Sequence, residues 1–320
     1  MSTHHDHHGH DHHGHDHHGH HHHPVDPNGN TRAFVLAITL NAIFVAIEFT
    51  YGFIANSTAL MADAGHNLSD VLGLLLAWGA AVLAKTEPSK RYTYGLRGSS
   101  ILAALGNALL LMLACGAIGW EAVQRLTENA PVAGKTVSIV AAIGVAVNGI
   151  SAWLFMAASK DDINIRGAYQ HLMADAAISL GVVVSGLVII FTGWVWLDPA
   201  VSLVIVVLIL MGTWSLLKES LRMALAGVPE SVDASKVKAF LREQPGVAEI
   251  HDVHIWAVST TETALTAHLV MPAGYPGDAA IDAIVAQLKS GHAIAHCTLQ
   301  VEQGTTLHDC ALHGEGHAAH

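Results

Sequence analysis

The stretch STALMADAGHNLSD, residues 57–70, decides the fold, because it puts imidazole and carboxylate side chains inside a long apolar run. His66 and Asp70 are four residues apart, so they share one face of a helix. A second apolar run repeats this spacing with His171 and Asp175. An ionised Asp at the centre of a bilayer costs at least ~2.5–3.5 kcal/mol on insertion scales. Each pair therefore needs a partner that offsets this cost.

The composition indicates that these runs lie in a membrane. Of the 320 residues, 52% are hydrophobic and only 13% are charged, whereas soluble domains carry about 25% charged residues. Six apolar runs approach the ~20 residues that a helix needs to span a bilayer. They cover residues 33–55, 59–84, 99–122, 135–158, 166–191 and 196–217. The sequence predicts an α-helical membrane protein with six transmembrane helices in residues 33–222.

The two His–Asp pairs are expected at the same depth. The second and fifth helices run antiparallel, and a rise of about 1.5 Å per residue brings both pairs near the middle of a ~30 Å hydrocarbon core. Two imidazoles and two carboxylates are a ligand set that zinc accepts in tetrahedral geometry. The absence of a thiolate disfavours copper(I), and the imidazoles disfavour magnesium and calcium. The alternative is that two satisfied His–Asp pairs only hold helices together.

Basic residues near the helix ends predict the orientation, because cytoplasmic loops are enriched in Lys and Arg. Only Arg125 and Lys135 lie on one side. The other side carries Arg32, Lys85, Lys90, Arg91, Arg97, Lys160, Arg166, Lys218 and Arg222. We therefore expect both termini to be cytoplasmic and the protein to reside in the inner (plasma) membrane, in contact with lipid.

Fourteen of the 25 histidines fall between residues 4 and 23, interleaved with Asp and Gly. This tract has no apolar residue, so residues 1–32 are predicted to be a disordered cytoplasmic tail. A purification tag is usually uninterrupted His, so a natural tail that collects metal is favoured. The formal net charge of −11 makes nucleic acid an unexpected partner.

After the sixth run the pattern changes to that of a small α+β domain at residues 226–305. Residues 233–244 and 278–290 predict amphipathic helices, and residues 247–258, 262–271 and 294–302 predict strands. The order αββαβ suits a sheet with helices on one face. Residues 306–320 are expected to form a flexible C-terminal tail.

Four motifs resemble those of the cation diffusion facilitator family. They are residues 57–70, the RYTYG loop at 91–95, the pair His171 and Asp175, and HDVHIW at 251–256. Spacing, order and helix number agree, and the similarity is greatest to bacterial zinc, cadmium and cobalt efflux proteins.

The resemblance has several implications. Such proteins are homodimers with a ferredoxin-like cytosolic domain, and they export divalent metal ions in exchange for protons by alternating access. The implied transport site consists of His66, Asp70, His171 and Asp175, a set similar to that of zinc-preferring members.

The resemblance also implies a zinc site in the cytosolic domain, formed by His251, His268 and Glu302. Some members have a His where this chain has Gln300, which leaves the number of ions open. Candidate replacements are His254, His296 and Cys310. The alternative for each of these residues is a solvated side chain.

Other polar residues fall within the apolar runs. Asn41, Glu48 and Asp63 are candidates for proton carriers or for partners of the metal ligands, or else for interhelical hydrogen bonds or end-of-helix groups that reach water. For Asn148 the structural alternative, an interhelical hydrogen bond or a group that reaches water, is favoured.

Two other classes of function would use the same metal-binding side chains. A membrane metalloenzyme would need an open coordination position and a base, and the chain has no HExxH motif. A metal sensor or storage protein would bind metal without moving it. An ATP-driven pump is excluded because no GxxxxGK[ST] phosphate loop is present.

Overall fold

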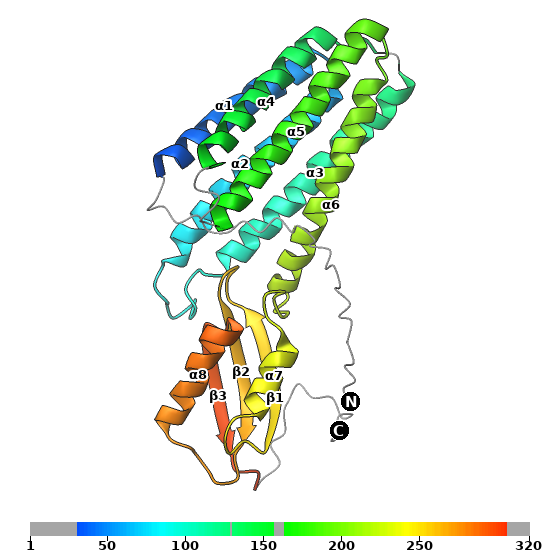
Figure 1. Ribbon diagram of the computed structural model, residues 1–320. Coiled ribbons are helices and arrows are strands. Elements are labelled where there is room, and N and C mark those ends of the chain that lie inside the picture. Colours follow the sequence, from blue (N-terminus) through cyan, green and yellow to red (C-terminus); the bar gives the residue numbers. More distant parts are fainter. Residues whose placement is uncertain (1–30, 129, 157–162, 306–320) are drawn as a thin grey trace, which may run out of the picture.

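The structure, a computed structural model, describes residues 31–128, 130–156 and 163–305 (Figure 1). The predictions for the His-rich stretch up to residue 30, for Lys160 and for the C-terminal tail with Cys310 lie outside the described residues.

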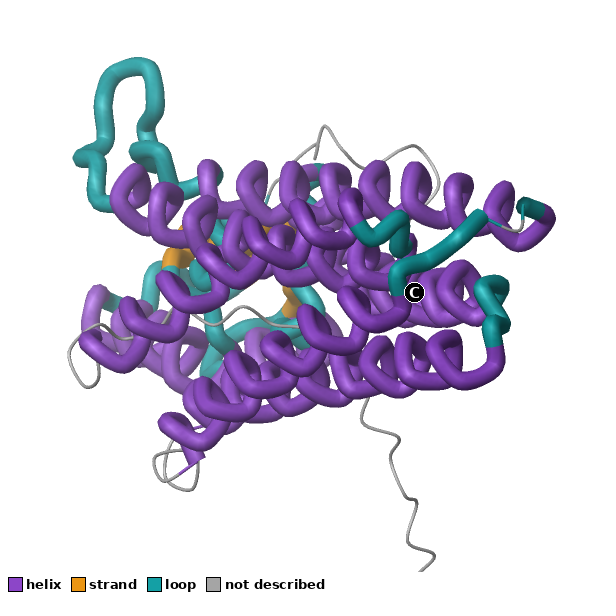
Figure 2. The backbone as a smooth tube through the Cα atoms, turned by 90° about the horizontal axis from the view of Figure 1, so that it is seen from above, coloured by secondary structure: helices purple, strands orange, loops and turns teal. Residues whose placement is uncertain are grey.

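Six long helices form a bundle at one end of the molecule (Figure 1). They are α1 Thr31–Ile54, α2 Thr58–Ala84, α3 Ser99–Thr127, α4 Gly134–Met156, α5 Ile163–Thr192 and α6 Leu197–Ala224. Figure 2 shows them running side by side. Helix α4 packs along α5, α3 packs along α6, and α2 contacts each of α1, α3, α5 and α6. Helix α2 therefore lies at the centre of the bundle.

Helices α2 to α6 are each long and apolar enough to cross a membrane. Helix α1 contributes a shorter apolar stretch, Thr39–Ile54. Large apolar side chains point outward from the bundle, among them Phe53, Trp78 and Phe191, which are 71–84% exposed. In water such a surface would be unfavourable, whereas lipid tails solvate it. This is a helical membrane domain.

Two helices extend well past their apolar runs. The sequence predicted α3 to end at residue 122 and α6 at residue 217, but they end at Thr127 and Ala224. The prediction followed hydrophobicity alone. Ion pairs between residues three or four apart stabilise helical turns that have become polar, and such pairs join Glu121 to Arg125 and Glu219 to Arg222.

Asp198, near the start of α6, fastens the first turn of α2. Its carboxylate is fully buried and accepts hydrogen bonds from the hydroxyl groups of Ser57 and Thr58. It also accepts backbone N–H donors from Thr58 at 2.7 Å and Ala59 at 3.3 Å. The first N–H groups of a helix have no partner within the helix, so a carboxylate from α6 satisfies them. This contact fixes one end of α2 against α6.

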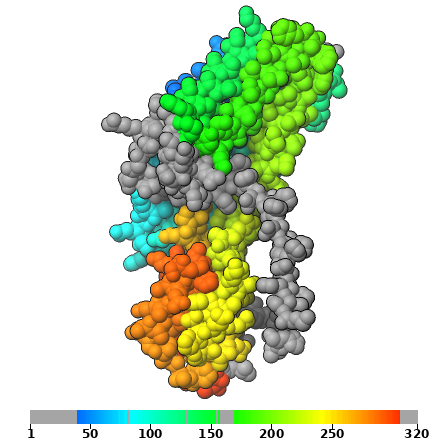
Figure 3. All heavy atoms as spheres, viewed as in Figure 1, coloured from blue at the N-terminus to red at the C-terminus, as the bar shows by residue number. Residues whose placement is uncertain are grey.

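The remaining elements form a small α+β domain below the bundle (Figure 3). They are α7 Ala234–Arg242, β1 Glu249–Ala257, β2 Thr263–Val270, α8 Asp278–His292 and β3 His296–Glu302. The three strands lie in the order β1–β2–β3, with β1 antiparallel and β3 parallel to β2. The predicted order αββαβ is confirmed; the ferredoxin-like likeness stays a prediction.

Both helices of this domain pack on one face of the sheet. Val237 and Leu241 of α7 and Leu288 of α8 join one apolar core with Leu265 and Leu269 of β2. The alternation expected for β2 therefore holds. Its other side chains, including that of His268, face away from the helices, which leaves the opposite face of the sheet free to carry polar groups.

Strand β1 departs from regular alternation. Ile250 and Ile255 are both buried in the core, although they are five positions apart, an interval that puts side chains on opposite faces of a regular strand. The pairing with β2 shifts between His251 and His254, and Asp252 has φ of +50°. A bulge of this kind turns the chain and re-aims side chains. The sequence pattern did not predict it.

The hairpin that joins β1 and β2 touches the bundle. Arg97 forms an ion pair with Glu262, and the backbone N–H of Thr260 donates to the Ser100 hydroxyl at 3.1 Å. The rings of Tyr94 and His296 meet edge to face, with centroids 5.8 Å apart. The loop of residues 85–98 therefore lies at the same end of the bundle as the small domain.

We predict that Asp198→Ala lowers the free energy of unfolding by about 3 kcal/mol, because it leaves buried hydroxyl and N–H groups without an acceptor. Denaturant unfolding in detergent micelles measures this change. Thr192→Ala, at the same end of the bundle, removes two exposed hydrogen bonds and serves as the control, with an expected change near ~0.5 kcal/mol. Equal losses in the two variants would show that the α2–α6 contact is unimportant.

Candidate metal site in the bundle and a second cluster in the small domain

The four predicted side chains of the bundle meet between α2 and α5. His66 Nε2 lies 3.3 Å from Asp175 and 3.8 Å from Asp70. His171 Nε2 lies 3.2 Å from Asp70 and 3.6 Å from Asp175. Each imidazole thus contacts its own carboxylate and the one on the other helix. Together, the two His–Asp pairs form a single cluster of four side chains.

Small side chains allow the neighbouring helices to pack closely against α2. Ala59, Ala62 and Ala64 of this helix are buried almost completely.

The cluster is more exposed on one side than on the other. The side chains of Asp175 and His66 are 5% and 13% exposed, whereas those of Asp70 and His171 are 23% and 28% exposed. One side of the cluster is closed and the other is open to the surroundings.

The spacing of the donor atoms suits a tetrahedral ion. Bonds of about 2.0–2.1 Å from zinc to nitrogen or oxygen place neighbouring tetrahedral ligands about 3.3 Å apart. The four nitrogen-to-oxygen distances run from 3.2 to 3.8 Å. Ligand atoms of His66, Asp70 and Asp175 all lie within 4.8 Å of one another. The cluster can therefore take a divalent ion after small side-chain shifts.

A second polar cluster lies next to these ligands. Asn67 donates a hydrogen bond to Glu48 at 3.2 Å, and Ser179 donates one to Asp63 at 2.8 Å. All four side chains are buried. The sequence indicated Glu48 and Asp63, but it gave no signal for Ser179, because serine is common in apolar helices.

Asn148 was predicted to make an interhelical hydrogen bond or to reach water, and this prediction is not confirmed. Its side chain is fully buried, and its amide has no hydrogen-bond partner among the described residues.

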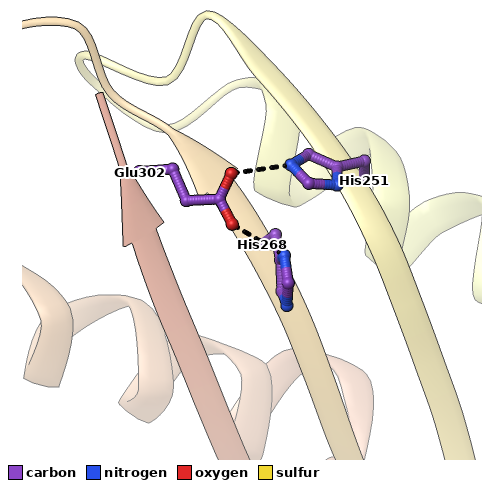
Figure 4. Close-up of side chains that lie close together, drawn as sticks. All are labelled: His251, His268 and Glu302. Atoms are coloured by element: carbon purple, nitrogen blue, oxygen red, sulfur yellow. Dashed lines mark hydrogen bonds and ion pairs between the residues drawn. The ribbon is translucent and has the colours of Figure 1, made fainter. Parts of the chain in front are cut away.

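The small domain brings together His251, His268 and Glu302 on the face of the sheet opposite its helices (Figure 4). Glu302 accepts from His251 at 3.0 Å and contacts His268 Nδ1 at 2.8 Å. The register explains the meeting, since His251 is paired with His268 in the adjacent strand and Glu302 ends β3 beside them. Ligand atoms of all three lie within 4.8 Å of one another. Two imidazoles and a carboxylate are a zinc-type donor set.

The histidines that could replace the ligand missing at Gln300 differ in position. His254 contacts Asp252 at 2.9 Å, and Asp252 reaches His268 at 3.5 Å, so both extend the cluster. Asp252 was missed, because its partner His268 lies on the neighbouring strand, which the spacing within β1 does not identify. His296 lies at the far end of β3, where its ring meets that of Tyr94 edge to face, away from the cluster.

Gln300 stands where some family members have a His ligand. Its amide donates to Glu302 at 2.8 Å, so it orients the carboxylate. Cys297 packs against the apolar core, and burial raises its pKa to about 11. Its thiol therefore faces the helices and not the His251–His268–Glu302 cluster.

The fold and the two clusters define a metal-handling membrane protein with a small extramembrane domain. Comparison with known families agrees. The family profile described as the cation efflux transmembrane domain matches residues 34–224, and the profile of the cation efflux protein cytoplasmic domain matches residues 229–304.

Several characterised proteins are similar over most of their length. The chain is 35% identical to the zinc transporter ZitB of Escherichia coli over 298 residues, which is 92% of this chain and 95% of that protein. It is 35% identical to the metal cation efflux system protein CzcD of Cupriavidus metallidurans, with coverage of 86% and 88%. It is 32% identical to the cadmium, cobalt and zinc/H(+)-K(+) antiporter of Bacillus subtilis, with coverage of 88% and 92%.

The chain therefore belongs to the cation efflux, or cation diffusion facilitator, family. It is a multi-pass membrane transporter and not an enzyme, which removes the metalloenzyme alternative.

We predict that Glu302→Gln lowers zinc affinity at the small-domain cluster by at least about tenfold, because the carboxylate contacts both imidazoles. Zinc titration against a competing chelator measures this loss in protein that lacks residues 4–23 and carries Asp70→Ala and Asp175→Ala, so that zinc binding by the His tract and the bundle cluster does not mask it. His292→Ala, which removes a histidine of α8 that packs on Phe240, is the control. An unchanged zinc affinity in Glu302→Gln would exclude this cluster as a zinc site.

Proposed function

We propose that the protein exports divalent transition-metal ions, zinc above all and also cadmium and cobalt, from the cytoplasm in exchange for protons. The observation that carries this proposal is the contact of each imidazole of the α2–α5 cluster with both carboxylates. Such a cluster offers one ion four ligands from two helices, so movement of α5 relative to α2 opens or closes it. The metal is the transported substrate.

The chemistry of the four ligands explains the proton coupling. Metal ligands must be deprotonated, so metal binding releases protons and proton binding expels metal. With the site open to a near-neutral cytoplasm, His66 and His171 bind metal. With the site open to a more acidic exterior, protons displace it. Alternating access around a fixed midplane site then produces export.

Several features of the assembly complete the proposal. Helix α1 is the sixth span, residues 33–222 are the transmembrane domain, and residues 226–305 are the cytosolic domain. Arg97 forms an ion pair with Glu262 of the small domain, which fits a cytoplasmic location for that end. The inner membrane is the expected location, with both termini cytoplasmic. The cytoplasmic-domain match supports a homodimer.

We predict that Asp70→Ala or Asp175→Ala abolishes zinc-driven proton flux, because each carboxylate contacts both imidazoles. Purified protein in liposomes, with a pH dye inside and a zinc gradient across the membrane, measures this flux. Glu128→Ala removes an exposed carboxylate at the end of α3 and serves as the control. Full residual flux in either aspartate variant would refute the transport site.

We predict that His66→Asp or His171→Asp reduces the preference for zinc over cadmium, because imidazole replacement changes both the charge and the geometry of the site. Initial rates in the same liposomes with each metal give the preference ratio. A ratio equal to that of the unaltered protein would count against this selectivity role.

A sensor or storage protein would bind metal in the same assay without net flux. Metal uptake into everted vesicles under an imposed pH gradient separates these functions, across zinc, cadmium, cobalt, nickel and iron. Deletion of residues 4–23 should leave uptake intact, because the His tract is expected only to raise the local metal concentration.

A further inference from the structure

Two carboxyl groups outside the metal cluster are completely buried and lie against each other. Glu48 of α1 and Asp63 of α2 each have 0% of their surface exposed. Their carboxyl groups are within hydrogen-bonding reach of one another. None of the Lys or Arg ion pairs formed within the described part of the chain involves either residue.

One oxygen of each carboxyl group is satisfied and the other is not. Asn67 donates to Glu48 Oε2, and Ser179 donates to Asp63 Oδ2. Glu48 Oε1 and Asp63 Oδ1 are buried and have no donor among the described residues. Two ionised carboxylates in contact, with no cation between them, repel each other strongly. A single proton shared by the pair removes one charge and supplies the missing donor.

The titratable groups around the pair do not supply the hydrogen-bond donor that Glu48 Oε1 and Asp63 Oδ1 lack. His66 and Asp175 interact with Asp63 only electrostatically. The titratable groups on the helices packed against α1 and α2 lie elsewhere: Lys135 starts α4, Glu121 pairs with Arg125 on α3, and Asp198 caps α2 from α6. Asp70 and His171 belong to the more exposed side of the metal cluster. Tyr51 lies near the end of α1.

The position of the pair links it to the transport helices. Asp63 precedes His66 by three residues, or about 4.5 Å along α2 towards the α1–α2 loop. Its partner Ser179 follows Asp175 by one turn of α5. Asn67, which holds Glu48, is adjacent to His66 in sequence. The pair therefore joins α1, α2 and α5 beside the metal cluster, through atoms that are not metal ligands.

We propose that Glu48 and Asp63 form a proton-binding site of the transport cycle, separate from the metal ligands, which holds one proton when α1, α2 and α5 are packed as in this structure. Separation of these helices exposes the carboxyl groups to water and releases that proton. This site deepens the proposed function and rests on its proton exchange: part of the proton movement would occur away from the zinc ligands.

Glu48→Gln and Asp63→Asn are suitable variants, because an amide can donate to the remaining carboxylate and so imitate the shared proton. We expect both to fold with thermal midpoints close to that of the unaltered protein, whereas Glu48→Ala should have a lower midpoint. Zinc affinity at the transport cluster should fall by less than about tenfold, the lower limit for residues that orient metal ligands. Glu121→Gln, on α3, is the matched control.

Difference infrared spectroscopy of the zinc-free, full-length protein detects the shared proton directly. The unaltered protein and Glu121→Gln should show the carbonyl stretch of a protonated carboxylic acid near pH 7, sensitive to exchange into D₂O. This band should be absent in Glu48→Gln and in Asp63→Asn. Persistence of the band in both variants would overturn the proposal. So would its loss on adding potassium ions to the unaltered protein, because a monovalent cation would then be the occupant.

Proton and zinc counts in liposomes test the role in transport. Protons moved per zinc should fall by about one in each single variant and no further in the double variant, because the pair holds one proton. Equal ratios in all proteins would overturn the role. If the unaltered protein moves no zinc but shows the carboxylic acid band, the proposed function fails and the proton site stands. If zinc flux is normal and the band remains in the variants, the proton site alone fails.

Discussion

The structure depends on the burial of carboxylates inside an apolar bundle. Each carboxylate taken from water into a low-dielectric interior must find hydrogen-bond donors or opposite charge, or must bind a proton. The chain uses a different solution at each of three places. Asp198 accepts from the uncapped turn of α2, Asp70 and Asp175 lie against imidazoles, and Glu48 lies against Asp63. Of the three, only the second groups imidazole and carboxylate donors closely enough to hold a metal ion.

These three contacts all involve α2, which explains why one helix organises the bundle. One end is tied to α6 through Asp198, the middle faces α5 through His66 and Asp70, and Glu48 of α1 binds between them. A movement of His66 or Asp70 can therefore shift α1 and α5 directly, without any contact to the small domain. The hairpin contact between Arg97 and Glu262 joins that domain to the other end of α2 and to α3.

Much of this could be predicted from residue spacing. The intervals from His66 to Asp70 and from His171 to Asp175 predicted which four side chains meet between α2 and α5, because a four-residue spacing fixes a helix face. The apolar runs gave the long helices and the alternation of β2 gave its buried face. The ends of α3 and α6 could not be predicted from hydrophobicity, since ion pairs extend them. Asp252 and Ser179 were missed because their partners, His268 and Asp63, lie on a neighbouring strand and a neighbouring helix, which spacing alone does not identify.

Zinc-edge anomalous diffraction from crystals of the zinc-loaded, full-length protein tests the central claim most directly. The account predicts an anomalous peak between α2 and α5, within about 2.0–2.2 Å of one atom from each of the two imidazoles and two carboxylates. Peaks confined to the small domain, with His66, Asp70, His171 and Asp175 paired only with one another, would contradict it.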